Sequence, residues 1–397
     1  MLQKCSQLLK RSILILVVVS AGFALTNCNQ SIEDTSIKTI QLADLNEKQS
    51  IDATQMVKHI QLIPLEFNED CAIESLDQID LYRDTIFILS NDQLFLFNKK
   101  GKFISKFASV GKGPGEYLSA FNFSIDRKAK QICIYDYMQD KIQVYDIKGK
   151  FIKKIPIGKS WQTIDNGNGN YVSYPLNILG NQPHSIVVVN TQGDTLKTFN
   201  NFLKFKLTGN PFLIHHVGAL YKKKNQIAFH QYLSDTLFYV NTEKLELIPH
   251  YILKGFNTLP LRFLGDIEAF EKSSDNYSWL NRIQESANYL YLTFKNEGSR
   301  KNILYSKQDD KLLLVPKLDS TITTNNLTPY FWPDQITEND QVINGWTAVS
   351  FLEKFKRIKA EEANVNFLKE HGIENFSALY QSIQKNDNPI IQITTLN

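Results

Sequence analysis

The stretch FLFNKKGKFI at residues 95–104 places Asn98 three residues before Gly101, between two runs of apolar, strand-forming residues. An Asn side chain at the first position of a turn accepts hydrogen bonds from the turn's own backbone. Gly at the later position supplies the positive φ that lets the second strand leave the turn. The stretch therefore predicts a β-hairpin between two half-buried strands.

The same hairpin pattern recurs along the chain. Its further copies are VYDIKGKFI (144–152), VVNTQGDTL (188–196), LFYVNTEKLEL (237–247, with Lys244 at the Gly position) and the degenerate ILYSKQDDKLLLV (303–315). The first-position residues Asn98, Asp146, Asn190 and Asn241 are separated by 48, 44 and 51 residues. A repeat of about 40–50 residues with several strands per unit is typical of a β-propeller, whereas a β-sandwich is not expected to repeat in this way. The sequence therefore predicts four-stranded antiparallel blades.

The number of blades follows from the length of the repeating part. Residues 60–397 hold about seven periods, but residues 266–290 and 346–385 are predicted to be helical insertions. In the second insertion, Phe351 and Phe355 recur at helical spacing among charged residues. The remainder predicts an all-β fold of six blades. We expect the C-terminal strand NPIIQITTLN (388–397) to pair with the strand near residues 63–65 and close the ring.

The composition is that of a globular protein, with 43% apolar and 21% charged residues. The formal charge of +3 arises from Lys4, Lys10 and Arg11, since without them the 44 basic residues become 41, equal to the 41 acidic residues. With this charge balance the sequence shows no excess of basic residues that would indicate nucleic-acid binding. The basic run at residues 222–224 is interpreted as a solvated turn. We expect a monomer.

The N-terminus has the features of an export signal. Its three basic residues precede ILILVVVSAGFAL (13–25), which is too short to remain as a membrane-spanning helix. The following Leu25-Thr26-Asn27-Cys28 resembles a bacterial lipobox, with Asn27 in place of the usual Gly or Ala. We therefore expect a lipoprotein signal peptide at 1–27, lipidation of Cys28, a polar tether at 28–40 and a single propeller domain at 41–397. An unmodified secreted protein is the alternative.

Residues 109–117, SVGKGPGEY, follow the first hairpin and resemble the GxGPGEY signature of six-bladed β-propeller lipoproteins of Bacteroidetes, which are related to NHL-repeat propellers. The resemblance covers about residues 40–397. It implies a lipid-anchored protein of the cell envelope, at the periplasmic or the exposed side of the outer membrane, and it implies no reaction. Glu116 and Tyr117 are candidate binding residues at the channel mouth. The alternative is that this element is only a turn between blades.

The sequence predicts no catalytic residues, metal site or cofactor, because no HExxH, GxSxG or calcium-loop motif is present. Of the seven histidines only His215 and His216 are adjacent. They are candidate binding residues, although neighbours in a strand point to opposite faces and cannot share a metal. The folded part holds two cysteines, Cys71 and Cys133. A disulfide between them is permitted in this compartment but is supported by no spacing argument.

Three functions are compatible with these features. The leading hypothesis is a binding or scaffolding module for a protein, peptide or glycan partner, with the 346–385 insertion shaping its surface. The alternative is an envelope lyase or hydrolase with a metal-assisted site, which requires carboxylates, amides or histidines to converge at one end of the channel. The third, a carbohydrate-capture protein, requires exposed aromatic rings at one mouth, for which the tryptophans are the candidates: Trp161, Trp279, Trp332 and Trp346.

Overall fold

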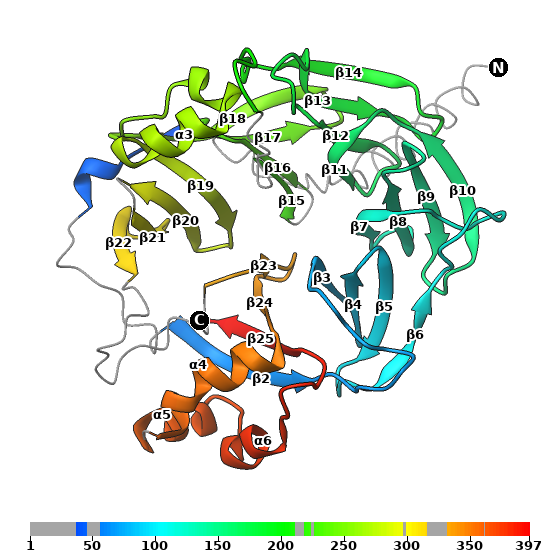
Figure 1. The fold of residues 1–397 in the computed structure, drawn as a ribbon, viewed down its shortest axis with the longest axis vertical. Coiled ribbons are helices and arrows are strands. Elements are labelled where there is room, and N and C mark those ends of the chain that lie inside the picture. The colour runs from blue at the N-terminus through cyan, green and yellow to red at the C-terminus, as the bar shows by residue number, and fades with distance from the viewer. Residues whose placement is uncertain are drawn as a thin grey trace, which may run out of the picture. The chain divides into compact units, whose positions relative to one another are not determined.

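The computed structural model describes residues 37–45, 56–210, 218–223, 226–296, 299–315, 332–360 and 362–397 (Figure 1). Within these residues the strands form six sheets that are arranged as propeller blades around a common axis, which we call the channel axis. The predicted fold class is confirmed: the blades are four-stranded and antiparallel, and helices are few.

Each of the first five blades is built from four consecutive strands, beginning with the strand nearest the channel. Blade 1 contains β3 (Gln78–Tyr82), β4 (Thr85–Ser90), β5 (Gln93–Asn98) and β6 (Phe103–Phe107). Blade 2 contains β7 (Ala120–Asp126), β8 (Gln131–Asp136), β9 (Lys141–Asp146) and β10 (Phe151–Pro156). Blade 3 contains β11 (Ser160–Asp165), β12 (Tyr171–Pro175), β13 (His184–Val189) and β14 (Thr195–Asn200).

Blades 4 and 5 follow the same order. Blade 4 contains β15 (Gly218–Lys223), β16 (Gln226–Gln231), β17 (Thr236–Asn241) and β18 (Glu246–Lys254). Blade 5 contains β19 (Ser278–Glu285), β20 (Tyr289–Asn296), β21 (Ser299–Ser306) and β22 (Lys311–Val315). A fifth strand, β1 (Lys38–Gln41), adds to blade 4 in parallel with β18, so regular structure begins before residue 41.

Blade 6 joins the two ends of the described chain. Its inner strands are β23 (Gln335–Ile336), β24 (Gln341–Trp346) and β25 (Ile390–Leu396), and its outermost strand is β2 (Val57–Pro64). Antiparallel pairing places Ile63 opposite Ile391. The predicted closure is therefore confirmed, and the C-terminal strand has a partner on each side, which removes an exposed sheet edge.

The repeated hairpins lie between the third and fourth strands of their blades. In blade 1 the side-chain oxygen of Asn98 accepts hydrogen bonds from two backbone N–H groups of the turn at 2.8 and 3.1 Å. Gly101 has φ +78°, and a Cβ there would lie 2.0 Å from the carbonyl oxygen of Pro64. Where Lys244 replaces the Gly, the positive φ moves to Leu245. Turn chemistry thus accounts for the repeat that the sequence displays.

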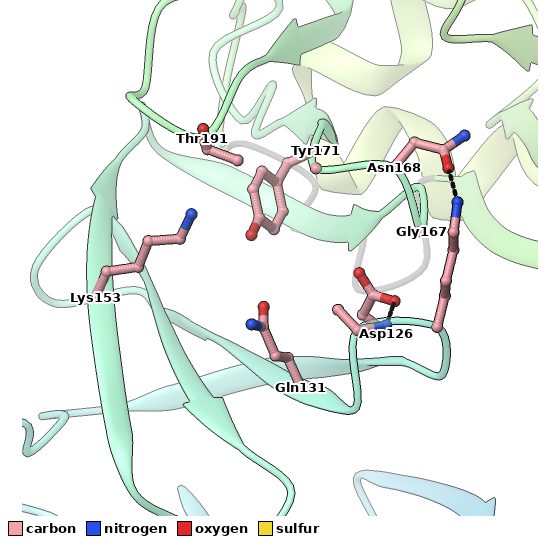
Figure 2. A pocket seen from close by; sticks show the side chains of 10 residues that line it. Asp126, Gln131, Lys153, Gly167, Asn168, Tyr171 and Thr191 are labelled. Carbon is pink, nitrogen blue, oxygen red and sulfur yellow. Dashed lines mark hydrogen bonds between the residues drawn. The ribbon is translucent and has the colours of Figure 1, made fainter.

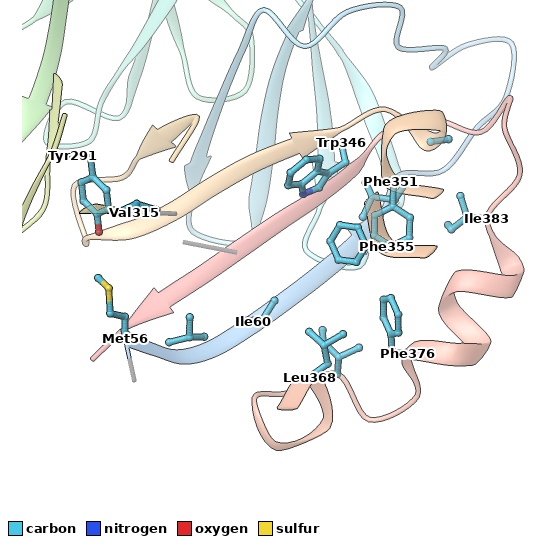
Figure 3. Close-up of a cluster of buried hydrophobic side chains, with 14 of the residues drawn as sticks. Met56, Ile60, Tyr291, Val315, Trp346, Phe351, Phe355, Leu368, Phe376 and Ile383 are labelled. Atoms are coloured by element: carbon cyan, nitrogen blue, oxygen red, sulfur yellow. The ribbon is translucent and has the colours of Figure 1, made fainter. Parts of the chain in front are cut away.

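The predicted insertion at 346–385 is helical and lies between β24 and β25. It contains α4 (Ala348–Ala360), α5 (Glu362–Glu370) and α6 (Phe376–Ser382). Figure 3 shows their apolar side chains packed on blade 6. Phe355 is fully buried, stacks on Phe351 at 4.3 Å and meets the edge of Trp346 at 5.8 Å. The three helices therefore belong to the hydrophobic core of the last blade.

The predicted helical insertion at 266–290 is wrong in its second half. Only α3 (Ile267–Ser273) and the short 3-10 helix Ser274–Asn276 are helical, and β19 follows. Leu280 and Ile283 are both fully buried in the same cluster although they are three residues apart. A bulge between Leu280 and Arg282 breaks the alternation of the strand. The bulge places both apolar side chains in the core, which imitates helical spacing in the sequence.

Carboxamide side chains join neighbouring inner strands around the channel. Gln162 of β11 donates to the carbonyl oxygen of Leu220 at 2.7 Å and accepts from its N–H at 2.8 Å. Two further pairs have the same reciprocal geometry: Gln78 with Phe123, and Asn122 with Thr163. Each amide replaces the backbone ladder that adjacent blades lack, and so satisfies peptide groups that would otherwise be unpaired.

Candidate functional site

The GPGEY element connects blade 1 to blade 2. The carboxylate of Glu116 accepts a hydrogen bond from the N–H of Gly113 at 2.7 Å, and a Cβ at Gly111 would lie 2.1 Å from that carboxylate. Tyr117 is fully buried in the core shared by blades 1 and 2, and its hydroxyl accepts from the side chain of Gln93 at 3.2 Å. These contacts stabilise the connection between blades 1 and 2.

The other candidate residues from the sequence have different positions. Cys28, His215 and His216 lie outside the described residues. Cys71 and Cys133 are both buried and both free, so they form no disulfide with each other. Burial raises the pKa of each thiol, which keeps both thiols protonated. Cys133 is thus a small apolar core residue.

Carboxylates converge where the inner strands end. At this end of the channel the Arg127 guanidinium bonds Asp80 at 2.9 Å and Glu338 at 3.2 Å, which joins blades 1, 2 and 6. Burial raises the pKa of Asp80 and of Glu338, although the guanidinium opposes this effect. The arrangement is a half-buried ion triplet in which one cation serves two acids.

The same end of the channel contains two more buried acids. Lys222 bonds Asp165 at 2.7 Å, and Glu285 bonds Lys307 at 2.6 Å and also Lys223. Burial opposes ionisation of Glu285, but the two ammonium groups outweigh it and hold the pKa below its usual value. The interpretation of residues 222–224 as a solvated turn is wrong for Lys222 and Lys223, since the acids that neutralise them come from other blades.

These acids meet the spatial requirement of the metal-assisted alternative, but their chemistry differs from it. Each of the four carboxylates has an Arg or Lys partner. In the described part of the chain no group of three His, Cys, Asp or Glu side chains is placed to hold a metal ion. A ring of paired charges that joins blades is primarily a structural device, because an unpaired buried charge is strongly destabilising.

An open cavity of about 460 Å³ lies between blades 2 and 3, and most of its lining residues have polar side chains (Figure 2). The turn after β7, the strand β10, the turn after β11 and the hairpin after β13 supply its lining. Asp126 and Tyr171 are buried, and Lys153 extends toward them from the opposite wall. Lys128 closes one rim through a 2.9 Å hydrogen bond to Asn168. The volume lies within the range of about 300–1,000 Å³ that small-molecule sites occupy.

Aromatic side chains gather at the opposite end of the channel, where β7 and β11 begin. The ring of Phe121 lies 5.2 Å from Tyr137 and 5.3 Å from Trp161, measured between centroids. The ammonium of Lys159 lies 5.3 Å from the Tyr137 ring centre, and Met138 beside it is 66% exposed. We call these five residues the aromatic mouth. Its rings are partly exposed, so they offer faces to a ligand.

A second cavity adjoins the aromatic mouth through Lys159, which lines both. Its volume is about 390 Å³, and Ser160, Gln182 and His184 supply polar groups to its walls. The Nδ1 atom of His184 is buried without a hydrogen-bond partner among the described residues. A buried unpaired nitrogen is a group that a ligand or an ordered water can satisfy.

None of the four tryptophans is fully exposed, and one of them contributes a half-buried ring to a mouth of the channel. Trp279 and Trp346 are buried. Trp161 and Trp332 are both half-buried and pack in part against core clusters, but only Trp161 belongs to the aromatic mouth. Sequence reasoning missed Phe121, although it is the second residue of β7 as Trp161 is of β11. Aligning the inner strands of successive blades would have identified the pair.

Comparison with known proteins identifies the family and the fold. The family described as "Domain of unknown function (DUF4934)" matches residues 37–395. The chain is similar to the structure of a protein of Bacteroides fragilis named as exported, at 17% identity over 91% of this chain and 100% of that one, with a TM-score of 0.67. A DUF4221 protein of Bacteroides vulgatus matches at 11% identity over 68% and 86% of the two chains, with a TM-score of 0.47.

No curated protein matches the chain. Among the described residues, no helix has the length and apolar character needed to cross a membrane. The family match spans nearly the whole chain, and the chain therefore belongs to the DUF4934 family of six-bladed propellers.

Proposed function

We propose that this member of the DUF4934 family is a lipid-anchored binding module of the outer membrane, and that its ligand is a carbohydrate chain held at the aromatic mouth. The anchor is the diacylated Cys28 that follows the export segment. Several acyl chains hold a protein firmly at a membrane, since each buried methylene contributes about 0.8 kcal/mol. The similarity to a protein named as exported supports this location.

The aromatic mouth is the observation that carries the proposal. Phe121, Tyr137 and Trp161 form one contiguous group of rings that is left partly exposed on a rigid sheet scaffold. Sugar rings have apolar faces and polar edges, so they stack on aromatic faces while their hydroxyl groups need hydrogen-bonding neighbours. Lys159 and the adjoining cavity supply those neighbours.

The experiment compares purified wild-type protein with Trp161→Ala and Phe121→Ala on an array of bacterial and host glycans. Phe67→Ala is the matched control, because it removes a 54% exposed aromatic side chain outside the aromatic mouth. We expect wild type and the control to bind the same oligosaccharide. Each variant of the mouth should lose at least tenfold in affinity, about 1.4 kcal/mol. Thermal unfolding of each variant checks that the propeller is intact.

Two outcomes contradict the proposal. One is that the wild-type protein retains no glycan on the array. The other is that folded Trp161→Ala and Phe121→Ala bind as tightly as the Phe67→Ala control.

A further inference from the structure

The cavity between blades 2 and 3 has two chemically different ends (Figure 2). Lys153, Gln131 and Tyr171 meet at one end, and the carboxylate of Asp126 lies at the other. The cavity is on the opposite side of the blades from the aromatic mouth, because it is built from turns that follow the inner strands. It is thus a separate feature of the molecule.

The first end offers hydrogen-bond donors. Lys153 has no hydrogen-bond or ion-pair partner among the described residues, and its side chain points into the cavity. The hydroxyl of Tyr171 accepts weakly from the thiol of Cys133 at 4.0 Å, which leaves its own hydrogen for an acceptor. Burial raises the pKa of Tyr171, so the phenol stays protonated and acts as a donor. An ammonium with a phenol and an amide beside it suits a carboxylate.

The second end offers a hydrogen-bond acceptor. The Asp126 carboxylate is 6% exposed and is fixed in place by the N–H of Ala129, which donates to it at 2.8 Å. A carboxylate held in this way accepts hydrogen bonds from hydroxyl groups and repels a second anion. The second ammonium in the lining, that of Lys128, already donates to Asn168 at 2.9 Å. The arrangement therefore favours a ligand that presents its negative charge to Lys153 and its hydroxyl groups to Asp126.

We propose that this cavity binds a small hydroxylated carboxylate with the chemistry of a sugar acid. The carboxylate pairs with Lys153 and accepts from Tyr171 and Gln131. The hydroxyl groups at the far end of the ligand donate to Asp126. The walls come from two blades, so the ligand also ties blade 2 to blade 3.

Isothermal titration calorimetry of the purified full-length protein tests the proposal, with sodium D-glucuronate as the probe. D-glucose lacks the carboxylate that pairs with Lys153, and acetate lacks the hydroxyl groups that donate to Asp126, so each compound can make only one of the two sets of contacts. We expect glucuronate to bind at least tenfold more tightly than either. Lys153→Met should weaken glucuronate binding at least tenfold.

Lys154→Met is the matched control, since Lys154 is the exposed neighbour of Lys153 on the same strand. It should bind glucuronate as wild type does. Folded Trp161→Ala should also bind glucuronate as wild type does, because the aromatic mouth lies on the other side of the blades. The proposal is overturned if glucuronate fails to bind at millimolar concentration or binds no better than glucose. It is also overturned if folded Lys153→Met binds as tightly as Lys154→Met.

Discussion

Replacing Gln162 by Met tests whether carboxamides hold the blades together. The change keeps the length of the side chain but removes the hydrogen bonds of 2.7 and 2.8 Å that join β11 to the Leu220 peptide of β15. An unpaired buried backbone group costs about 1–3 kcal/mol. Gln162 is itself partly exposed, so water can recover part of that loss. We therefore expect the free energy of unfolding to fall by about 2–4 kcal/mol.

Urea unfolding followed by circular dichroism measures this loss. Gln192→Met is the control, since Gln192 is exposed in a hairpin and makes no contact between blades. It should change the free energy of unfolding by less than about 0.5 kcal/mol. If Gln162→Met were as stable as Gln192→Met, the carboxamides would not be the connection between inner strands.

Three other predictions concern acid stability, packing and anchoring. Burial lowers the pKa of His230 to about 4, so on acidification the unfolded chain binds a proton before the folded chain does. The free energy of unfolding should therefore fall by about 3 kcal/mol as the pH drops from 6.5 to 4. Urea midpoints measured over this pH range should depend less on pH in His230→Gln than in wild type, and an equal dependence would contradict the prediction. Phe355→Ala should lower the free energy of unfolding by about 3–5 kcal/mol, because it empties a buried position. Val349 is 42% exposed on the same helix, so Val349→Ala should change this free energy by less than about 0.5 kcal/mol. Equal losses in urea unfolding would show that Phe355 does not hold the helices on the blade. Cys28→Ala should abolish palmitate labelling and release the protein from the membrane fraction, and labelling that persists would exclude lipidation at this residue.

The features that the sequence predicted correctly depend on local chemistry. The hairpins were visible because the side-chain cap of Asn98 and the positive φ of Gly101 are requirements of the turn itself. The helical insertion was visible because Phe351 and Phe355 face one core. The closing strand was visible because its apolar residues lie at the C-terminal end of the repeating part, where a propeller needs a strand to close its ring.

The features that the sequence did not predict depend on contacts between residues that are far apart in the chain. Lys222 and Lys223 were assigned to solvent because their acids, Asp165 and Glu285, are 57 and 62 residues away. The bulge at Leu280 likewise needs the register of the neighbouring strand. A single sequence displays neither kind of information.

The aromatic mouth is an intermediate case. Trp161 was already a candidate from its residue type. Its neighbours Phe121 and Tyr137 come from a different blade. The Phe121 ring meets the Trp161 ring, at a centroid distance of 5.3 Å, only because blades 2 and 3 pack side by side. The sequence therefore predicted the type of side chain at the aromatic mouth but not the surface that these side chains form.

A crystal structure of the protein soaked with the oligosaccharide selected on the glycan array would test the central claim most directly. We predict electron density for a sugar ring stacked on Trp161 or Phe121, with hydroxyl groups reaching Lys159 and the cavity beside it. Density for the same oligosaccharide only in another part of the molecule, with the aromatic mouth unoccupied, would contradict the account.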